Sequence, residues 1–166
     1  GNLERDLNIL DNWTTQQKIE NTQIKAWLKT SEIQKNWLYR KFSSLDLDKQ
    51  QDPKIAILGL AYKENTNSIK NSPSIQLLKK INENDIKVYD PLVKKIKIKN
   101  IKEVNSSYDA IINTDILVIA TPWEEFNRLD LNIIKLKMRG NIIIDPYKIL
   151  DQISAIKLGF KYYFID

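Results

Sequence analysis

The run KIAILGLAYKENTNSIKNSP, from Lys54 to Pro73, constrains the fold of this chain more than any other segment. KIAIL is a short apolar run rich in β-branched residues, which is typical of a buried strand in a parallel sheet. Gly59 follows it, where the backbone must turn or approach a ligand closely. Ser72 is a natural N-cap residue and Pro73 suits the first helical position, so a helix is predicted to begin there. A strand, a tight turn and a helix in this order indicate an open α/β sheet.

Two lysines, Lys63 and Lys70, lie in the loop between this strand and this helix. Open α/β sheets bind ligands beyond the carboxyl ends of their strands, so both ammonium groups are candidates for holding an anion. An ordinary loop with solvated lysines has the same spacing. The spacing alone leaves both interpretations open.

The alternation of strand and helix patterns continues to the end of the chain. Strands are predicted at 54–58, 86–89, 115–120, 141–144 and 160–164, and helices at 73–83, 107–113, 130–138 and 150–157. Asp130 is placed to cap the third of these helices, and Gly140 to follow its end as a C′ glycine. The pattern predicts an α/β fold, a Rossmann-like parallel sheet of about five to six strands with helices on both faces.

A long helical arm is predicted before the sheet. Apolar residues, among them Trp27 and Trp37, recur at three- and four-residue intervals across 15–42, as on one face of a helix. Ser31 and Gln34 have the spacing of a capping box, which places a possible break near residue 30. A stripe this aromatic favours docking onto a second chain or another domain.

The segments beside this arm are less regular. Residues 1–12 show little sign of secondary structure, and LDLDKQQDP (45–53) is typical of a linker. We therefore divide the chain into residues 1–53, the arm and linker, and residues 54–166, the α/β domain.

Composition excludes several kinds of chemistry. The chain has no cysteine and no histidine, which excludes disulfides, thiolate or imidazole metal sites, Ser-His-Asp triads and cysteine nucleophiles. No stretch approaches the roughly 18 apolar residues of a membrane span, and no signal segment is present. We expect a protein of the cytoplasm, without a membrane partner. The chain begins with Gly rather than Met, which is typical of a piece of something longer.

The charge balance is basic, with a net charge of +5. A basic domain invites a nucleic-acid interpretation, and the densest patch is KKIKIKNIK (94–102). Only four of the 26 basic residues are arginines. Proteins that recognise phosphates and bases favour arginine, whose planar guanidinium forms paired hydrogen bonds. Alternating Lys and Ile is typical of an edge strand protected by charge, so we expect no nucleic-acid partner.

From residue 54 onward the chain resembles the C-terminal domain of the UDP-glucose/GDP-mannose dehydrogenase family, the NAD-dependent nucleotide-sugar 6-dehydrogenases. The run from Lys54 to Pro73 is similar to the family's strand, its G-L-A-F-K loop and its T-D-D-I-R-x-S-P helix start. Three further matches follow in the family's order: VYDP (88–91), TDILVIATPWEEF (114–126) and NIIIDPYKIL (141–150). The resemblance implies a UDP-binding domain whose parent protein oxidises the C6 alcohol of a UDP-sugar to a uronic acid.

The arm extends the resemblance. SEIQKNWLYRKF (31–42) is similar to the later part of the helix that joins the family's two α/β domains and forms its dimer core, which implies a homodimer through the 15–42 helix. GNLERD (1–6) is similar to the family's G-x-C-[FL]-P-K-D segment. Asp6 then matches the catalytic aspartate, and Asn2 stands at the position of the nucleophilic cysteine. Since asparagine cannot form a thioester and the family's N-terminal domain holds NAD, the chain alone is expected to be inactive.

The resemblance also implies a substrate site. Lys63 matches a lysine that contacts the sugar nucleotide, and Tyr62 takes the aromatic position before it. One ammonium on a diphosphate is worth roughly 1.5–3 kcal/mol. Lys70 stands where the family has an arginine, and Tyr147 and Lys148 occupy the arginine region after the fourth strand. These five residues are the candidate substrate site.

Several positions depart from the family's pattern. Asn67 and Ser68 replace two acidic residues, and lysine in place of arginine weakens bidentate phosphate recognition. Trp123 and Glu124 match the pattern, although packing and a helix-start carboxylate explain them as well. The departures favour an alternative, a non-catalytic relative that serves as a nucleotide-binding or dimerisation module.

Overall fold

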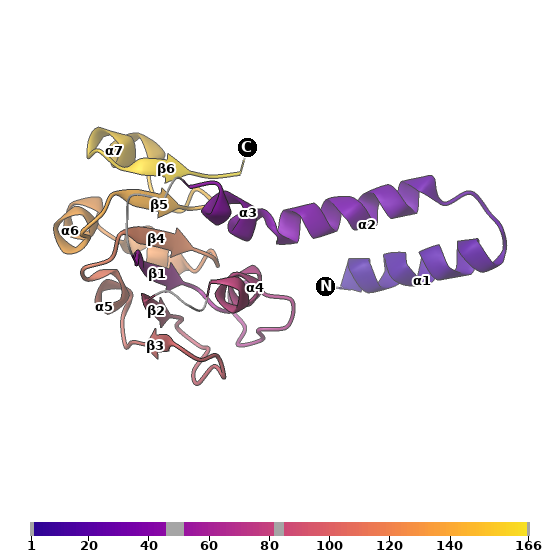
Figure 1. The fold of residues 1–166 in the computed structure, drawn as a ribbon, viewed down its shortest axis with the longest axis horizontal. Coiled ribbons are helices and arrows are strands. Elements are labelled where there is room, and N and C mark those ends of the chain that lie inside the picture. The colour runs from indigo at the N-terminus through magenta and orange to yellow at the C-terminus, as the bar shows by residue number, and fades with distance from the viewer. Residues whose placement is uncertain (1, 46–51, 82–84, 166) are drawn as a thin grey trace. The chain divides into compact units, whose positions relative to one another are not determined.

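The computed structural model describes residues 2–45, 52–81 and 85–165, which fall into two compact units divided between Trp37 and Leu38. The first unit is helical and the second contains the sheet (Figure 1). The functional division at 53/54 stays a prediction, and most of the predicted linker lies outside the described residues.

The first unit is a hairpin of two helices, α1 (Asn2–Gln16) and α2 (Thr22–Lys35). Asn21 fastens the turn between them, because its side-chain amide donates to Asp11 Oδ1 and Thr15 Oγ1, at 2.9 Å each. Near the open end of the hairpin, Lys35 forms an ion pair with Glu4.

Two expectations for the arm are therefore wrong. Residues 2–12 are helical: Leu7 and Thr14, two turns apart on α1, are both buried, so one face of this segment packs as a helix does. The 15–42 segment is not one helix, because α1 ends at Gln16, α2 begins only at Thr22 and ends at Lys35, and α3 (Trp37–Ser43) follows after Asn36. The helix is interrupted at 17–21 and at residue 36 and not at residue 30, and the predicted capping box lies inside α2.

The second unit is built on a six-stranded sheet with the order β3-β2-β1-β4-β5-β6. Every neighbouring pair is parallel, which confirms the predicted fold class. The strands β1 and β4 at the centre are buried almost throughout, as expected for a sheet covered on both faces. The strand bounds are β1 (Lys54–Leu58), β2 (Asp85–Tyr89), β3 (Ile101–Glu103), β4 (Ile116–Ile119), β5 (Ile142–Ile144) and β6 (Lys161–Tyr163).

The helices of this unit divide between the two faces of the sheet. The connection β1–α4–β2 runs in one direction along the sheet, and the connections through α5, α6 and α7 run in the other. Right-handed crossovers therefore place α4 on one face and α5 to α7 on the opposite face. The bounds are α4 (Pro73–Lys80), α5 (Ser107–Ile111), the 3₁₀ helix η1 (Glu124–Arg128), α6 (Leu131–Lys137) and α7 (Gln152–Lys157).

The ends of α6 and α7 confirm one expectation and correct another. Asp130 caps α6 by accepting from Asn132 N at 2.7 Å. Gly140 is not a left-handed C′ glycine; a Cβ there would lie 2.5 Å from Asp115 O, so close backbone approach explains it. The glycine that follows a helix with a positive φ is Gly159, with φ +86°, after α7.

The basic segment 94–102 forms less strand than expected. Only Ile101–Glu103 pairs with β2, as the edge strand β3. The chain before it turns back onto Glu103, whose carboxylate accepts from Lys95 N and Ile96 N at 2.7 and 2.8 Å. These contacts bend residues 95 and 96 away from a strand path. Across the described part of the chain, no helix combines the length and apolar character that crossing a bilayer requires.

Candidate functional site

The order of the sheet places the candidate site. Strand order reverses between β1 and β4, and open sheets bind ligands beyond the carboxyl ends of the strands at such a switch point. The loops after β1, β2 and β4 converge there.

Gly59 makes the first turn out of β1. It has φ +93, and a Cβ at this position would lie 2.5 Å from Thr121 Cβ. Its N–H donates to Tyr89 O at 2.8 Å. Only glycine fits both the backbone conformation and this close approach to the loop after β4.

Asp90, directly after β2, joins the three loops. Its side chain is buried, with 2% of the residue exposed. Oδ2 accepts from Leu60 N at 2.7 Å, from Ala61 N at 3.1 Å and from Trp123 Nε1 at 3.1 Å. Oδ1 accepts from the backbone N–H groups of Leu92 and Val93 at 2.9 and 2.8 Å. Five donors satisfy the hydrogen-bonding capacity of this buried side chain.

A sequence pattern marks Asp90. Asp90 belongs to the VYDP match, and an Asp-Pro pair recurs as Asp145-Pro146 directly after β5. Neither carboxylate is assigned a role by the family resemblance. Trp123 is confirmed as a packing residue, since it is buried and donates to Asp90. Glu124 is exposed and pairs with Arg128.

Tyr62, Lys63 and Lys70 all lie in the loop between β1 and α4 and are exposed. Lys63 Nζ lies 5.6 Å from the centroid of the Tyr62 ring. The helix start that follows confirms Pro73 at the first turn of α4. Ser72 occupies the N-cap position, but its hydroxyl lies 2.7 Å from Ser74 Oγ and does not cap the helix.

Tyr147 and Lys148 lie in the loop between β5 and α7 and are exposed. Lys148 has φ +55, and its Nζ lies 3.9 Å from the centroid of the Phe164 ring, in a cation–π contact. The structure thus places the five candidate substrate residues in two groups, one on the loop after β1 and one on the loop after β5. Between these two strands lies β4.

Asp145 holds the second of these loops. Its buried carboxylate accepts from Leu150 N at 2.9 Å, from Tyr147 N at 3.2 Å and from the Tyr162 hydroxyl at 2.6 Å. Burial raises the pKa of Asp145, although these hydrogen bonds act in the opposite direction. Burial and the bond to Asp145 together raise the pKa of Tyr162 well above its usual range.

Stability toward unfolding is expected to fall as pH rises above about 10, where tyrosines of the unfolded chain lose their protons. Tyr162 keeps its proton in the folded protein, so the folded state binds more protons in this range and loses stability as pH rises. Urea unfolding of the wild type and of Tyr162→Phe at pH 8 and at about pH 11 measures this. The variant should lose less stability between the two pH values, and equal losses would contradict the assignment.

Asn2 and Asp6 lie on α1, in the helical unit. The guanidinium of Arg5 contacts Asp6 Oδ1 at 3.0 Å, and both side chains are exposed. The segment that resembles the family's active-site loop is therefore helical here, and the roles of Asn2 and Asp6 stay predictions.

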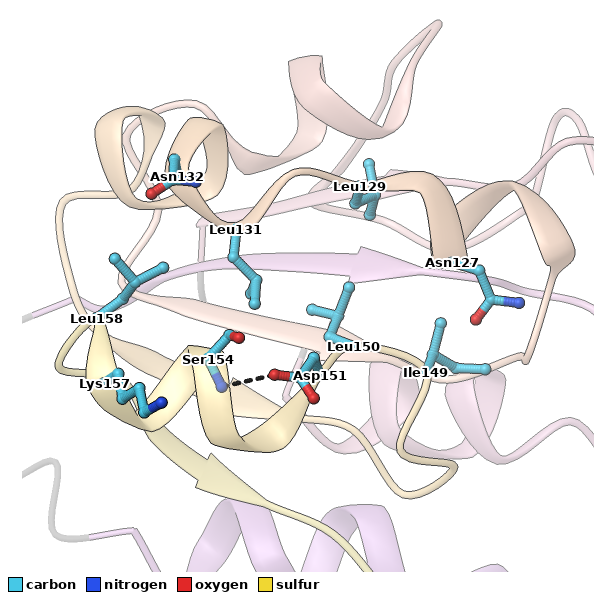
Figure 2. Close-up of a pocket in the computed structure, with 10 residues that line it drawn as sticks. All are labelled: Asn127, Leu129, Leu131, Asn132, Ile149, Leu150, Asp151, Ser154, Lys157 and Leu158. Carbon is cyan, nitrogen blue, oxygen red and sulfur yellow. Dashed lines mark hydrogen bonds between the residues drawn. The ribbon is translucent and has the colours of Figure 1, made fainter.

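A pocket of about 470 Å³ opens between α7 and the segment from η1 to α6 (Figure 2). Leucines and polar side chains line it together. Its one carboxylate already serves the protein, because Asp151 Oδ1 accepts from Ser154 N at 2.7 Å as the cap of α7. Its lining residues do not include the candidate substrate residues. They are Asn127, Leu129, Leu131, Asn132, Ile149, Leu150, Asp151, Ser154, Lys157 and Leu158.

Comparison with known proteins decides the family. The model of the UDP binding domain of the UDP-glucose/GDP-mannose dehydrogenase family matches residues 56–152. The chain belongs to this family. The match contains both loops of candidate substrate residues and the Asp90 carboxylate, whereas Asn2 and Asp6 lie outside it.

Individual members of the UDP-glucose/GDP-mannose dehydrogenase family extend the likeness over most of the chain. The UDP-glucose 6-dehydrogenases of Rickettsia conorii and Rickettsia prowazekii are 33% and 31% identical to it, over 96% of its length. The structure of a UDP-D-ManNAc dehydrogenase from Pyrococcus horikoshii matches 92% of this chain, with a TM-score of 0.73 and 26% identity. The match covers 35% of the length of the Pyrococcus protein. The chain spans 38% of the length of these two Rickettsia relatives.

Proposed function

We propose that this chain is the nucleotide-sugar-binding part of an NAD-dependent UDP-sugar 6-dehydrogenase, an oxidoreductase that converts a C6 alcohol to a uronic acid. One observation carries the proposal: the loop with Tyr62 and Lys63 stands at the switch point of the sheet, inside the region that matches a UDP binding domain. Uronic acids supply polysaccharide biosynthesis, which is the pathway class this reaction suits.

The candidate residues take separate roles in this proposal. Lys63 and Lys148 hold the diphosphate as point charges, and Tyr62 forms a wall of the pocket. Lys70 and Tyr147 complete the site from the same two loops. For Lys148 to reach a diphosphate, its ammonium must leave the Phe164 ring, and a cation–π contact at an exposed site is weak enough, about 0.5–1 kcal/mol, to allow this.

NAD does not fit the turn after β1. A dinucleotide fingerprint needs glycines in the spacing G-x-G-x-x-G, whereas Gly59 is followed by Leu60, Ala61, Tyr62, Lys63 and Glu64. We propose that NAD is bound by another domain of the parent protein. Asp6 and Asn2 would then stand at its catalytic aspartate and cysteine positions, and this chain alone would not catalyse the reaction.

The proposed partner of the arm is a second copy of the chain, through the 15–42 segment. Trp27 and Ile33 on α2 are 56% and 43% exposed. An apolar pocket of about 530 Å³ lies between the helices of the hairpin and is lined by Leu3, Leu7 and Trp27, among others. A homodimer would cover these side chains. We propose a cytoplasmic protein whose ligands are nucleotide sugars, without nucleic-acid or membrane partners.

A second candidate function keeps the binding site and loses the reaction. Asparagine at the cysteine position, Asn2, favours a non-catalytic relative that binds nucleotides or assembles with its partner. An assay of the full-length parent protein for NADH formation with a panel of UDP-sugars separates the two. Turnover supports the dehydrogenase, and nucleotide binding without turnover supports the module.

Removing the ammonium of Lys63 tests the site itself. Lys63→Ala is expected to weaken UDP binding at least about tenfold, because a charge-assisted contact is worth about 1.5–3 kcal/mol. Isothermal titration of the chain with UDP measures the change. Lys161→Ala is the matched control, since it removes an exposed lysine at the first residue of β6, the opposite end of the sheet. Equal effects of the two variants would exclude a specific role for Lys63.

A further inference from the structure

The backbone that leads to Lys63 is held at every N–H from Gly59 to Tyr62. Gly59 donates to Tyr89 O, and Tyr62 donates to Ser68 O at 3.0 Å. The two N–H groups between them, of Leu60 and Ala61, both donate to the carboxylate of Asp90. Lys63 follows at once, with its side chain in solvent.

The carbonyl groups of the same residues are held from other elements. Thr121, in the loop after β4, donates from Oγ1 to Ala61 O at 2.6 Å. Ser74, in the first turn of α4, donates from Oγ to Leu60 O at 3.3 Å. Residues 60 and 61 are thus fixed on their N–H side by the loop after β2 and on their C=O side by the loop after β4 and by α4.

Placing a carboxylate at this buried position costs free energy of folding. Burying a charge requires full compensation by hydrogen bonds, and apolar side chains often stabilise a protein as well or better at such sites. What the carboxylate adds is a defined conformation of the loop, because Oδ2 alone accepts from the loop after β1 at two places and from Trp123 of the loop after β4. This is the arrangement needed to hold a binding residue in place.

We infer that Asp90 and Thr121 are positioning residues for Lys63, which fix the point from which its ammonium reaches a nucleoside diphosphate. The inference rests on the proposed function of Lys63. With the backbone held as far as Tyr62, little of the chain beyond Lys63 itself must become ordered when the ligand binds. Less conformational freedom is then lost, and the contact contributes more to affinity.

A double-mutant cycle on UDP affinity tests this. Titration calorimetry of the 166-residue chain compares the wild type, Lys63→Ala, Asp90→Asn and the double variant. Asparagine keeps the shape of the side chain but turns an NH₂ group toward backbone donors, which releases the loop on one side. We expect Lys63→Ala to weaken binding about tenfold or more in the wild type but less than about threefold in the Asp90→Asn background.

Thr121→Val provides a second, independent background, because it removes only the hydroxyl that holds Ala61 O. Thr121→Val should reduce the effect of Lys63→Ala on UDP affinity in the same way. This background tests the inference even if Asp90→Asn does not fold. Asp115→Asn is the matched control. Asp115 is a buried aspartate that accepts from Lys54 N at 2.8 Å, at the opposite end of β1. In the Asp115→Asn background, Lys63→Ala should weaken UDP binding by the same factor as in the wild type.

The outcomes separate the inference from the proposed function. Additive effects of Lys63→Ala in the Thr121→Val and Asp90→Asn backgrounds, with UDP binding intact in the wild type, would overturn the positioning role alone. A folded wild-type chain that does not bind UDP would overturn the proposed function and this inference together. If Asp115→Asn reduced the effect of Lys63→Ala on UDP affinity as much as Asp90→Asn does, Asp90 would act only through the general stability of the fold. That result would also overturn the inference.

Discussion

Asp90→Ala is expected to destabilise the sheet-containing unit by about 3–5 kcal/mol, because several buried donors lose their acceptor at once. The substitution leaves buried N–H groups of Leu60 and Ala61 and the Trp123 indole without their acceptor. Each unsatisfied donor costs about 1–3 kcal/mol, and the costs are not additive. Urea unfolding followed by circular dichroism measures the loss.

Asp130→Ala is the control for this variant. Asp130 also accepts backbone hydrogen bonds, as the cap of α6, but it is exposed. Loss of such a cap costs about 0.5–2 kcal/mol. If Asp90→Ala costs no more than Asp130→Ala, the carboxylate does not organise the three loops as described.

Gly59→Ala should be comparably severe, with a loss of about 3–5 kcal/mol or failure to fold, because backbone strain and overpacking act together. The new Cβ would lie 2.5 Å from Thr121 Cβ and 2.7 Å from Thr121 N, and φ is +93. Thr121 belongs to the loop after the central strand β4 and is fully buried, so it cannot move aside. Thermal unfolding of the purified variant measures the effect.

Gly159→Ala separates the two causes of this loss. Gly159 has a similar φ of +86, but the nearest atom to its Cβ would be Lys135 Nζ, at 3.9 Å. Only the backbone strain remains there, so the cost should be about 1–2 kcal/mol. Equal losses at Gly59 and Gly159 would show that contact with Thr121 is unimportant.

The sheet was predictable because its signals are local. The run KIAIL gave β1 at its observed bounds, and DILVIA contains β4. Both are continuous apolar runs, which is what burial on two faces requires. The strand expected over KKIKIKNIK is mostly absent because the backbone N–H groups of Lys95 and Ile96 donate to the Glu103 carboxylate. Alternation of residue types does not reveal this contact.

The candidate site was predictable only in part, for a related reason. The loop with Tyr62 and Lys63 follows from a glycine after a strand and from the family resemblance. Asp90 was missed because its role depends on donors 29 to 33 residues away in sequence, Leu60, Ala61 and Trp123. Likewise, α1 was missed because its buried face appears only when α2 folds back against it.

The central claim, that this chain carries a nucleotide site at the switch point of its sheet, is tested most directly by thermal unfolding in the presence of UDP, UDP-glucose, GDP and inorganic diphosphate. At about 100 times its dissociation constant, a ligand that binds only the folded state adds about 2.7 kcal/mol of stability. We predict that UDP and UDP-glucose raise the melting temperature, that diphosphate alone does much less, and that Lys63→Ala removes most of the shift. A melting temperature that none of the four ligands changes, in a chain that unfolds cooperatively, would contradict the account.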